Sequence, residues 1–119
     1  MSQIKYFSTN HKAAEVTFGE ALLKGLAPDK GLFMPNAIPS FSPQELNSLK
    51  GNQYYEIAAK VFSKFLGDEV PMADLLAMTK DAYNFAVPLE QVVDRKYVMR
   101  LDQGPTASFK DFAGRMMGR

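Results

Sequence analysis

The run YYEIAAKVFSKFL at residues 54–66 is the feature that most constrains how this chain can fold. Its apolar residues recur at intervals of three and four, which places them on one face of a helix. These residues are Tyr54, Ile57, Ala58, Val61, Phe62, Phe65 and Leu66. Asn52 is suited to cap the start of this helix and Gly67 to end it. So wide an apolar face must be buried against other elements, so we expect a predominantly helical packed unit.

Three other segments before residue 90 carry signals of helices. Two have the spacing of a capping box, in which a hydroxyl side chain and a glutamate three residues later bond to each other's backbone N–H groups. The pairs are Thr17 with Glu20 and Ser42 with Glu45, with Pro43 after the second cap and Gly25 and Gly51 at the expected ends. The third helix opens at Pro71 and is expected to run to the region of Pro88. The sequence thus predicts about four helices before residue 95.

Two short strands and a loop are also predicted. Weak alternation at residues 3–7 indicates a short N-terminal strand, and residues 97–101 indicate a second strand with unpaired edges. Between residues 25 and 35, glycine and proline predict a turn-rich loop. We expect Leu26, Leu32 and Phe33 of this loop to face the core, and Asp29 and Lys30 to form a solvated turn.

Charge and composition exclude several classes of function. The chain carries 14 Lys and Arg against 13 Asp and Glu, dispersed along 119 residues, so we expect no nucleic-acid partner. It has no cysteine, and His11 has no identifiable carboxylate partner, so we expect no metal site. Neither a signal peptide nor a membrane-spanning stretch is apparent, which favours a cytoplasmic protein without a membrane partner.

The segment GPTASFKD at residues 104–111 contains the candidate for chemistry. Its glycine turn leads to Ser108, which is expected to cap a helix with Asp111 closing the box, and Lys110 then lies in the first helical turn. Because the helix dipole disfavours an ammonium there, the amine loses its proton more readily and suits nucleophilic chemistry. Phe109 and Phe112 are expected to give it apolar cover.

Simpler interpretations of this segment stay open. Most lysines are solvated, and Lys110 by itself is no exception. A phosphate-binding loop is disfavoured because the spacing does not match G-x-x-x-x-G-K-[ST]. Asp111 is explained as a helix-box acceptor, although a carboxylate next to Lys110 also favours the charged amine.

The motifs TFGEALLKGLAPDKGLFMPNAIP, FLGDEVP and GPTASFKDFAGR, in this order along the chain, resemble the N-terminal portion of the longer form of threonine synthase. The resemblance extends from Tyr6 to Arg119. It implies a mostly α N-terminal region of an α/β enzyme of the fold-type II group, which depends on pyridoxal 5'-phosphate (PLP). That family converts O-phospho-L-homoserine and water to L-threonine and phosphate.

The resemblance also implies roles for residues of this chain. The family lysine that binds PLP as an imine corresponds to Lys110, which would also move protons during catalysis. Ser108 and Thr106 are candidates for positioning the cofactor, although helix capping explains Ser108 equally well.

The implied organisation is a helical region at residues 1–94 and the start of the PLP-binding domain at residues 95–119. Because the last helix stops after about three turns, we expect a truncated chain that is inactive alone. Two alternatives remain: a non-catalytic helical interaction module that self-associates through its exposed strand edge, and a related enzyme for another phosphorylated amino compound.

Overall fold

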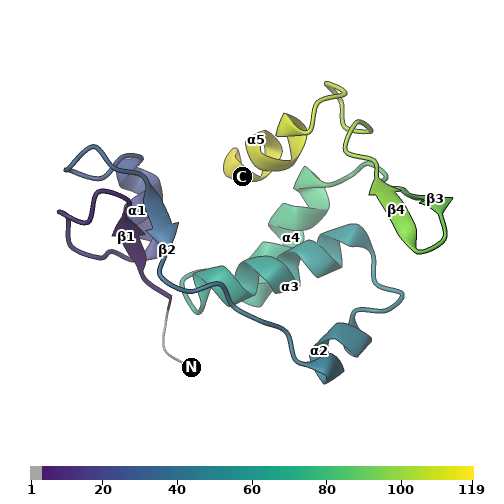
Figure 1. Cartoon of the computed structure of the whole chain (residues 1–119), viewed down its shortest axis with the longest axis horizontal. Helices are drawn as coiled ribbons and strands as arrows, with labels where there is room; N and C mark the ends of the chain where they lie inside the picture. The colour runs from purple at the N-terminus through teal and green to yellow at the C-terminus, as the bar shows by residue number, and fades with distance from the viewer. Residues whose placement is uncertain (1–3) are drawn as a thin grey trace.

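The computed structural model describes residues 4–119 and contains five helices and four short strands within that range (Figure 1). In chain order these are β1 (Tyr6–Ser8), α1 (Phe18–Lys24), β2 (Phe33–Pro35), α2 (Pro43–Ser48), α3 (Tyr54–Leu66), α4 (Met72–Ala82), β3 (Leu89–Val93), β4 (Lys96–Met99) and α5 (Lys110–Met117). The strand predicted at residues 3–7 corresponds to β1, and residue 3 lies outside the described residues. The helical character inferred from the sequence is confirmed.

The first unit of the fold is formed by β1, α1 and β2, at the left of Figure 1. β1 pairs antiparallel with β2, with Tyr6 opposite Pro35. The segment predicted as a loop thus contains a strand. The expectation that Leu26 and Leu32 face the core is wrong, because each is 58% exposed and Ala27 is buried instead. Leu26 and Leu32 pair with each other in an isolated β-bridge. Neighbouring side chains of an extended backbone face opposite sides, so Ala27 faces inward where Leu26 faces outward.

Asp29 and Lys30 lie in a turn, as expected, and Lys30 is exposed, but Asp29 is also an organising residue of this unit. Its carboxylate accepts hydrogen bonds from the Ser8 hydroxyl and from the backbone N–H groups of Lys12 and Gly31. Ser8 is completely buried, so this carboxylate is the partner of a hydroxyl without access to water. These bonds, first of all the one from Ser8, hold the pKa of Asp29 below its ordinary value of 3.8.

We expect Asp29→Asn to destabilise the chain in a pH-dependent way. A carboxyl whose pKa is lowered by folding contributes stability that is fully present above the unfolded pKa and is lost as the pH falls through the folded pKa. The difference between wild type and Asp29→Asn should therefore be constant near neutral pH and shrink below about pH 4. Urea unfolding across this range measures it. Glu15→Gln, on an exposed residue of the same unit, is the control, and a difference independent of pH would contradict the prediction.

The capping boxes at the starts of α1 and α2 are confirmed. Thr17 Oγ1 accepts from Glu20 N while Glu20 accepts from Thr17 N, and Ser42 and Glu45 do the same. The helix predicted from Asn52 begins one residue later, with Gln53 at the N-cap and its N–H bonded to Glu56. Glutamine is not one of the usual N-cap residues. The start of α3 is therefore set by the Glu56 side chain, which bonds back to the backbone of Gln53.

The core lies between α3 and α4, which pack along each other at the centre of Figure 1. One cluster is built on Ala59, Leu66 and Leu75, and a second on Ala58, Ala82 and Tyr83. The small alanines on both helices permit a close approach of the two backbones. α4 ends at Ala82 and does not reach Pro88, because Tyr83 leaves the helical conformation and buries its ring in the second cluster.

A single carboxylate links the N-terminal unit to the α3–α4 pair. Glu69, in the connection between α3 and α4, accepts from the N–H groups of Phe18 and Gly19 at 3.0 and 2.9 Å. These N–H groups belong to the first turn of α1, where helical N–H groups have no partner within the helix and negative charge is favoured. Tyr6 adds a second link, since its hydroxyl donates to the Phe65 carbonyl at 3.4 Å.

Replacing Glu69 by alanine is expected to lower the free energy of unfolding by about 2 kcal/mol, because two N–H groups of α1 lose an ionised partner. Chemical unfolding of the purified chain measures the change. The matched control is Asp68→Ala, the exposed neighbour in the same connection, which should be close to neutral. Equal effects of the two substitutions would show that the link contributes nothing specific.

The strand predicted at residues 97–101 is β4, at 96–99, and it pairs antiparallel with β3 in a hairpin. One edge of the predicted strand is therefore paired, and the expected unpaired edges are confined to the outer edges of this two-stranded hairpin, which carry no further strand among residues 4–119. β3 escaped prediction because all five of its residues are exposed, which leaves no inward and outward alternation to detect. The hairpin also spans residue 94, the predicted domain boundary, which stays a prediction.

Candidate functional site around Lys110

Lys110 is the first residue of α5 and follows the turn at residues 104–108, which connects the β4 segment to that helix (Figure 1). Its side chain is exposed, and among residues 4–119 no hydrogen bond or ion pair holds its amine. The predicted position in the first helical turn is thus confirmed. The structure thus presents Lys110 as an exposed primary amine.

The helix cap predicted at Ser108 is wrong in its partners. Phe109 occupies the N-cap position and Asp111 does not close a box with Ser108. Both carboxylate oxygens of Asp111 instead accept from Thr106, one from its N–H at 3.0 Å and one from its hydroxyl at 2.9 Å. Ala107 has φ of 54°, a left-handed conformation, and this reversal brings Thr106 within reach of Asp111.

Ser108 keeps a local role at the start of the helix. Its hydroxyl oxygen accepts from Lys110 N at 3.3 Å, and its carbonyl accepts from Asp111 N at 3.0 Å. The three residues predicted to form the site, Thr106, Ser108 and Lys110, therefore belong to one hydrogen-bonded turn.

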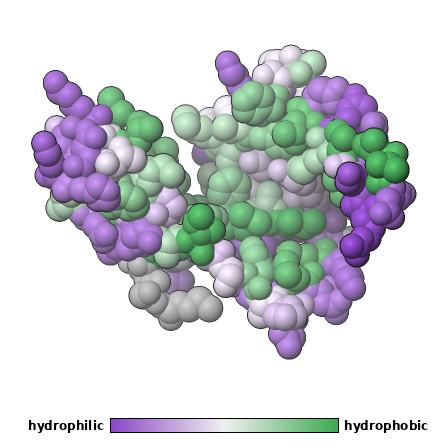
Figure 2. All heavy atoms as spheres, viewed as in Figure 1, coloured by the Kyte–Doolittle hydropathy of each residue, from purple (hydrophilic) through white to green (hydrophobic). Residues whose placement is uncertain are grey.

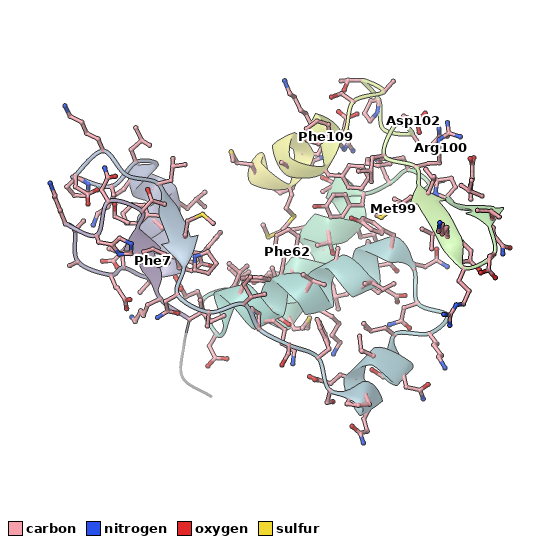
Figure 3. The ribbon with its side chains drawn as sticks, viewed as in Figure 1. Phe7, Phe62, Met99, Arg100, Asp102 and Phe109 are labelled. Carbon is pink, nitrogen blue, oxygen red and sulfur yellow. The ribbon has the colours of Figure 1, made fainter. Side chains whose placement is uncertain are left out.

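The apolar cover predicted for Lys110 is absent in the described residues. Phe109 is 66% exposed. It lies at the beginning of α5 (Figure 3). Phe112 points into a cluster of aromatic rings with Tyr54, Tyr83 and Phe85, whose centroids lie 5.3 to 5.8 Å from its own. Phe109, at the N-cap, and Phe112 are three residues apart, yet only Phe112 packs against the cluster that contains Ala82 and Tyr83, where it is partly buried.

The aromatic cluster fixes α5 against α3 and α4. Tyr83 donates from its hydroxyl to the Phe112 carbonyl at 3.1 Å. Burial, with a smaller contribution from Tyr54, raises the pKa of Tyr83 to about 12, so this hydroxyl stays protonated and remains a donor. The start of α5, and with it Lys110, is thereby held to the helical core.

Arg115 provides a second anchor that sequence reasoning missed. Its guanidinium donates to the carbonyls of Ala82 and Asp81 at 2.6 and 3.2 Å, and to Asn84 Oδ1 at 3.0 Å. The first two are among the last carbonyls of α4, which have no partner within that helix. Asp111 and Arg115 are four residues apart, a spacing typical of an ion pair within one helix. The sequence therefore gives no sign that Arg115 bonds to the end of α4.

Arg100 holds the segment that leads from β4 to the turn. Its guanidinium donates to both carboxylate oxygens of Asp102 at 2.9 and 2.6 Å, and to Glu90 of β3 at 2.7 Å (Figure 3). The bonds from Arg100, followed by one from Gln103, hold the pKa of Asp102 well below its usual range. Beside this cluster lies a shallow open hollow of about 310 Å³, lined in part by Met99, Leu101 and Phe109.

The other candidates from the sequence contribute no chemistry to this site. The His11 ring stacks on Phe7 at 5.1 Å between centroids, within the N-terminal unit. Residues 4–119 hold no group of three or more His, Cys, Asp or Glu side chains arranged to bind a metal ion. Within the same range no helix is long and apolar enough to cross a membrane.

Comparison with known proteins identifies relatives along almost the whole chain. Residues 5–83 match the family model described as threonine synthase N terminus. The threonine synthase of Haemophilus influenzae is 38% identical over 113 residues, which are 95% of this chain and 26% of that protein. The threonine synthase of Pseudomonas aeruginosa is 36% identical, over 98% of this chain and 26% of that protein.

Solved structures agree with these sequence matches. A PLP-bound threonine synthase from Brucella melitensis superposes with a TM-score of 0.85 at 39% identity, over 97% of this chain and 27% of that one. The threonine synthase of Escherichia coli gives a TM-score of 0.86 at 34% identity, over 95% of this chain and 26% of that one. The fold is thus that of the N-terminal part of an enzyme. The chain belongs to the threonine synthase family, and it spans about a quarter of the length of the relatives it matches.

Proposed function

We propose that this chain supplies the N-terminal quarter of a threonine synthase of the fold-type II group, a PLP-dependent lyase of amino-acid biosynthesis in the cytoplasm. Its substrate is O-phospho-L-homoserine, which reacts with water to give L-threonine and phosphate. The observation that carries the proposal is the free amine of Lys110 at the start of α5, in a chain whose relatives are threonine synthases. A PLP-bound relative with the same fold supports the choice of cofactor.

The residues around Lys110 fit a cofactor that carries an aldehyde. Covalent attachment requires an accessible primary amine without a competing ion pair, and Lys110 meets this requirement among residues 4–119. PLP, when bound, supplies an electron sink that stabilises negative charge at the α-carbon of an amino acid. The lysine would hold the cofactor through Nζ.

The proposed catalytic role of Lys110 is the movement of protons at the substrate. Its four-carbon side chain lets Nζ reach neighbouring carbon atoms without movement of the backbone. Because α5 is anchored by Phe112 and Arg115, the Cα of Lys110 stays in place while its side chain moves. A tethered base at a fixed origin has a high effective concentration near the reacting atoms.

Ser108 and Thr106 are proposed to position the cofactor or the substrate beside Lys110. The Thr106 hydroxyl already donates its hydrogen to Asp111, so its oxygen is left as an acceptor. Ser108 accepts from Lys110 N, and its own hydroxyl hydrogen is available to a ligand. The two side chains would therefore recognise different groups.

The experiment that tests the function is a threonine synthase assay of the full-length protein with PLP. Threonine and phosphate should appear in equal amounts from O-phospho-L-homoserine. Release of phosphate without threonine would overturn the assignment, and turnover of only another phosphorylated amino compound would favour the related-enzyme alternative. Because its relatives are about four times as long, the 119-residue chain alone should form no threonine.

A second candidate function, self-association of the 119-residue chain, is favoured by its exposed surface. The accessible surface is 8382 Å², whereas a compact protein of 13.3 kDa exposes about 6,500 Å². The excess, about 1,900 Å², is comparable to the surface buried in a standard protein interface. Figure 2 shows hydrophobic residues over α3 and toward the β3–β4 hairpin, where Val93, Tyr97 and Val98 are exposed. Light scattering tests this candidate, and a strict monomer at high concentration would contradict it.

A further inference from the structure

We propose that Asp111 is a positioning residue for Lys110, acting through the turn at residues 104–108. This inference rests on the proposed role of Lys110 as the cofactor lysine. It adds a requirement that the family resemblance does not contain: a buried carboxylate must hold the turn in shape for the neighbouring amine to meet its ligand.

The first observation is burial. Asp111 is 7% exposed, and among the buried polar side chains of residues 4–119 it is the only one that can carry a charge, the others being Ser8 and Thr79. A carboxylate is seldom buried unless hydrogen bonds compensate for the loss of water. Here the compensation comes from one residue, Thr106, through its N–H and its hydroxyl.

The second observation is how closely the turn surrounds this carboxylate. A Cβ added to Gly104 would lie 2.4 Å from Asp111 Oδ2 and 2.8 Å from Asp111 Cβ, so only glycine fits at that position. The turn is closed by a hydrogen bond from Ala107 N to the Gly104 carbonyl at 3.0 Å. Ala107 itself adopts a left-handed φ of 54°, which a residue with a side chain seldom adopts without a constraint.

The third observation is that the turn and α5 are held in place by different contacts. α5 is held to the core by Phe112 and Arg115, through contacts that do not involve Asp111. Loss of the Asp111 carboxylate should therefore release residues 104–108 and leave α5 docked. Among residues 4–119 no ion pair joins Asp111 to Lys110, so Asp111 acts on the amine through the geometry of the turn.

The test compares Asp111→Ala with Asp111→Asn in the full-length protein. Asparagine can accept from Thr106 N–H through its carbonyl and donate to the Thr106 oxygen, so it keeps the turn without the charge. Alanine keeps neither bond. Asp74→Asn, which removes an exposed carboxylate in the first turn of α4, is the control for the loss of one negative charge.

The first readout needs no cofactor. Hydrogen exchange of the peptide that contains residues 104–108, followed by mass spectrometry, should be at least tenfold faster in Asp111→Ala. Asp111→Asn should stay within about threefold of wild type. Exchange in α4 and the melting temperature should change little, because α5 stays anchored. Unchanged exchange of the turn in Asp111→Ala would overturn the inference.

The second readout is specific to positioning. The apparent dissociation constant for PLP and the yield of PLP fixed to Lys110 by borohydride should worsen at least tenfold in Asp111→Ala and be largely restored in Asp111→Asn. A mobile turn with wild-type PLP binding would show that Asp111 is only structural. If wild type itself carries no PLP at Lys110, the proposed function fails, while the exchange experiment still decides whether Asp111 holds the turn.

If Asp111→Ala does not fold, the contact is tested by substitution of its other residue, Thr106. Thr106→Val removes the hydroxyl that donates to Asp111 and keeps the shape of the side chain, whereas Thr106→Ser keeps the donor. Faster exchange of residues 104–108 in Thr106→Val but not in Thr106→Ser would support the inference; PLP binding is not compared in this pair, because Thr106 is itself proposed to contact the cofactor. Equal behaviour of the two variants would overturn it.

Discussion

Lys110→Ala in the full-length protein is expected to lower the rate of threonine formation at least about 10³-fold, since the substitution removes both the attachment point of the cofactor and the proposed acid and base. Lys110→Arg should be similarly impaired, because a guanidinium stays protonated and cannot form the covalent link. Both variants should fold normally, as the Lys110 side chain is exposed and its amine makes no hydrogen bond or ion pair within residues 4–119.

The measurement combines an assay with chemical labelling. Borohydride reduction in the presence of PLP, followed by peptide mass spectrometry, should add the cofactor to Lys110 in wild type and to no residue in the variants. Lys96→Ala, on the exposed β4 strand, is the matched control and should retain full activity and labelling. A cofactor label on another lysine, or an active Lys110→Ala variant, would refute the assignment.

The largest effect on stability is expected for Leu75→Ala, which should lower the free energy of unfolding by about 3 kcal/mol. Leu75 is completely buried between α3 and α4, where it packs with Ala59 and Leu66. The substitution leaves a cavity in the centre of the only extensive helix pair of residues 4–119, and neighbouring side chains cannot close it without moving a helix.

Leu76→Ala is the natural comparison, because the same side chain is removed from the next position of the same helix. Leu76 is 36% exposed, so its loss should cost about 1 kcal/mol or less. Urea unfolding of both variants, followed by circular dichroism, gives the two values. Equal destabilisation would mean that α4 does not face α3 as described.

Local signals predicted much of the fold. The capping boxes of α1 and α2 and the apolar face of α3 depend on residues within one or two helical turns, and each of these elements forms as expected. The errors came where a distant contact decides the outcome. β3 exists because β4 pairs with it, and α4 stops at Ala82 because Tyr83 turns toward the aromatic cluster.

In the candidate site, too, local signals predicted some features and other features depended on the folded backbone. The position of Lys110 in the first turn of α5 followed from the glycine turn and the apolar pattern after it. The partner of Asp111 did not, because two acceptable hydroxyls, Thr106 and Ser108, lie within five residues of it. Only the left-handed backbone of Ala107 determines which one it bonds.

By itself the sequence determined which segments are helical, where α1 and α2 begin and that Lys110 lies in the first turn of the last helix, because these depend on the spacing of neighbouring residues along the chain. Tertiary structure alone decided the burial of Asp111, the exposure of Phe109 and the docking of Arg115 onto the end of α4. Burial and hydrogen bonding depend on which surfaces meet in space, and residues 33 positions apart meet only once the helices have packed.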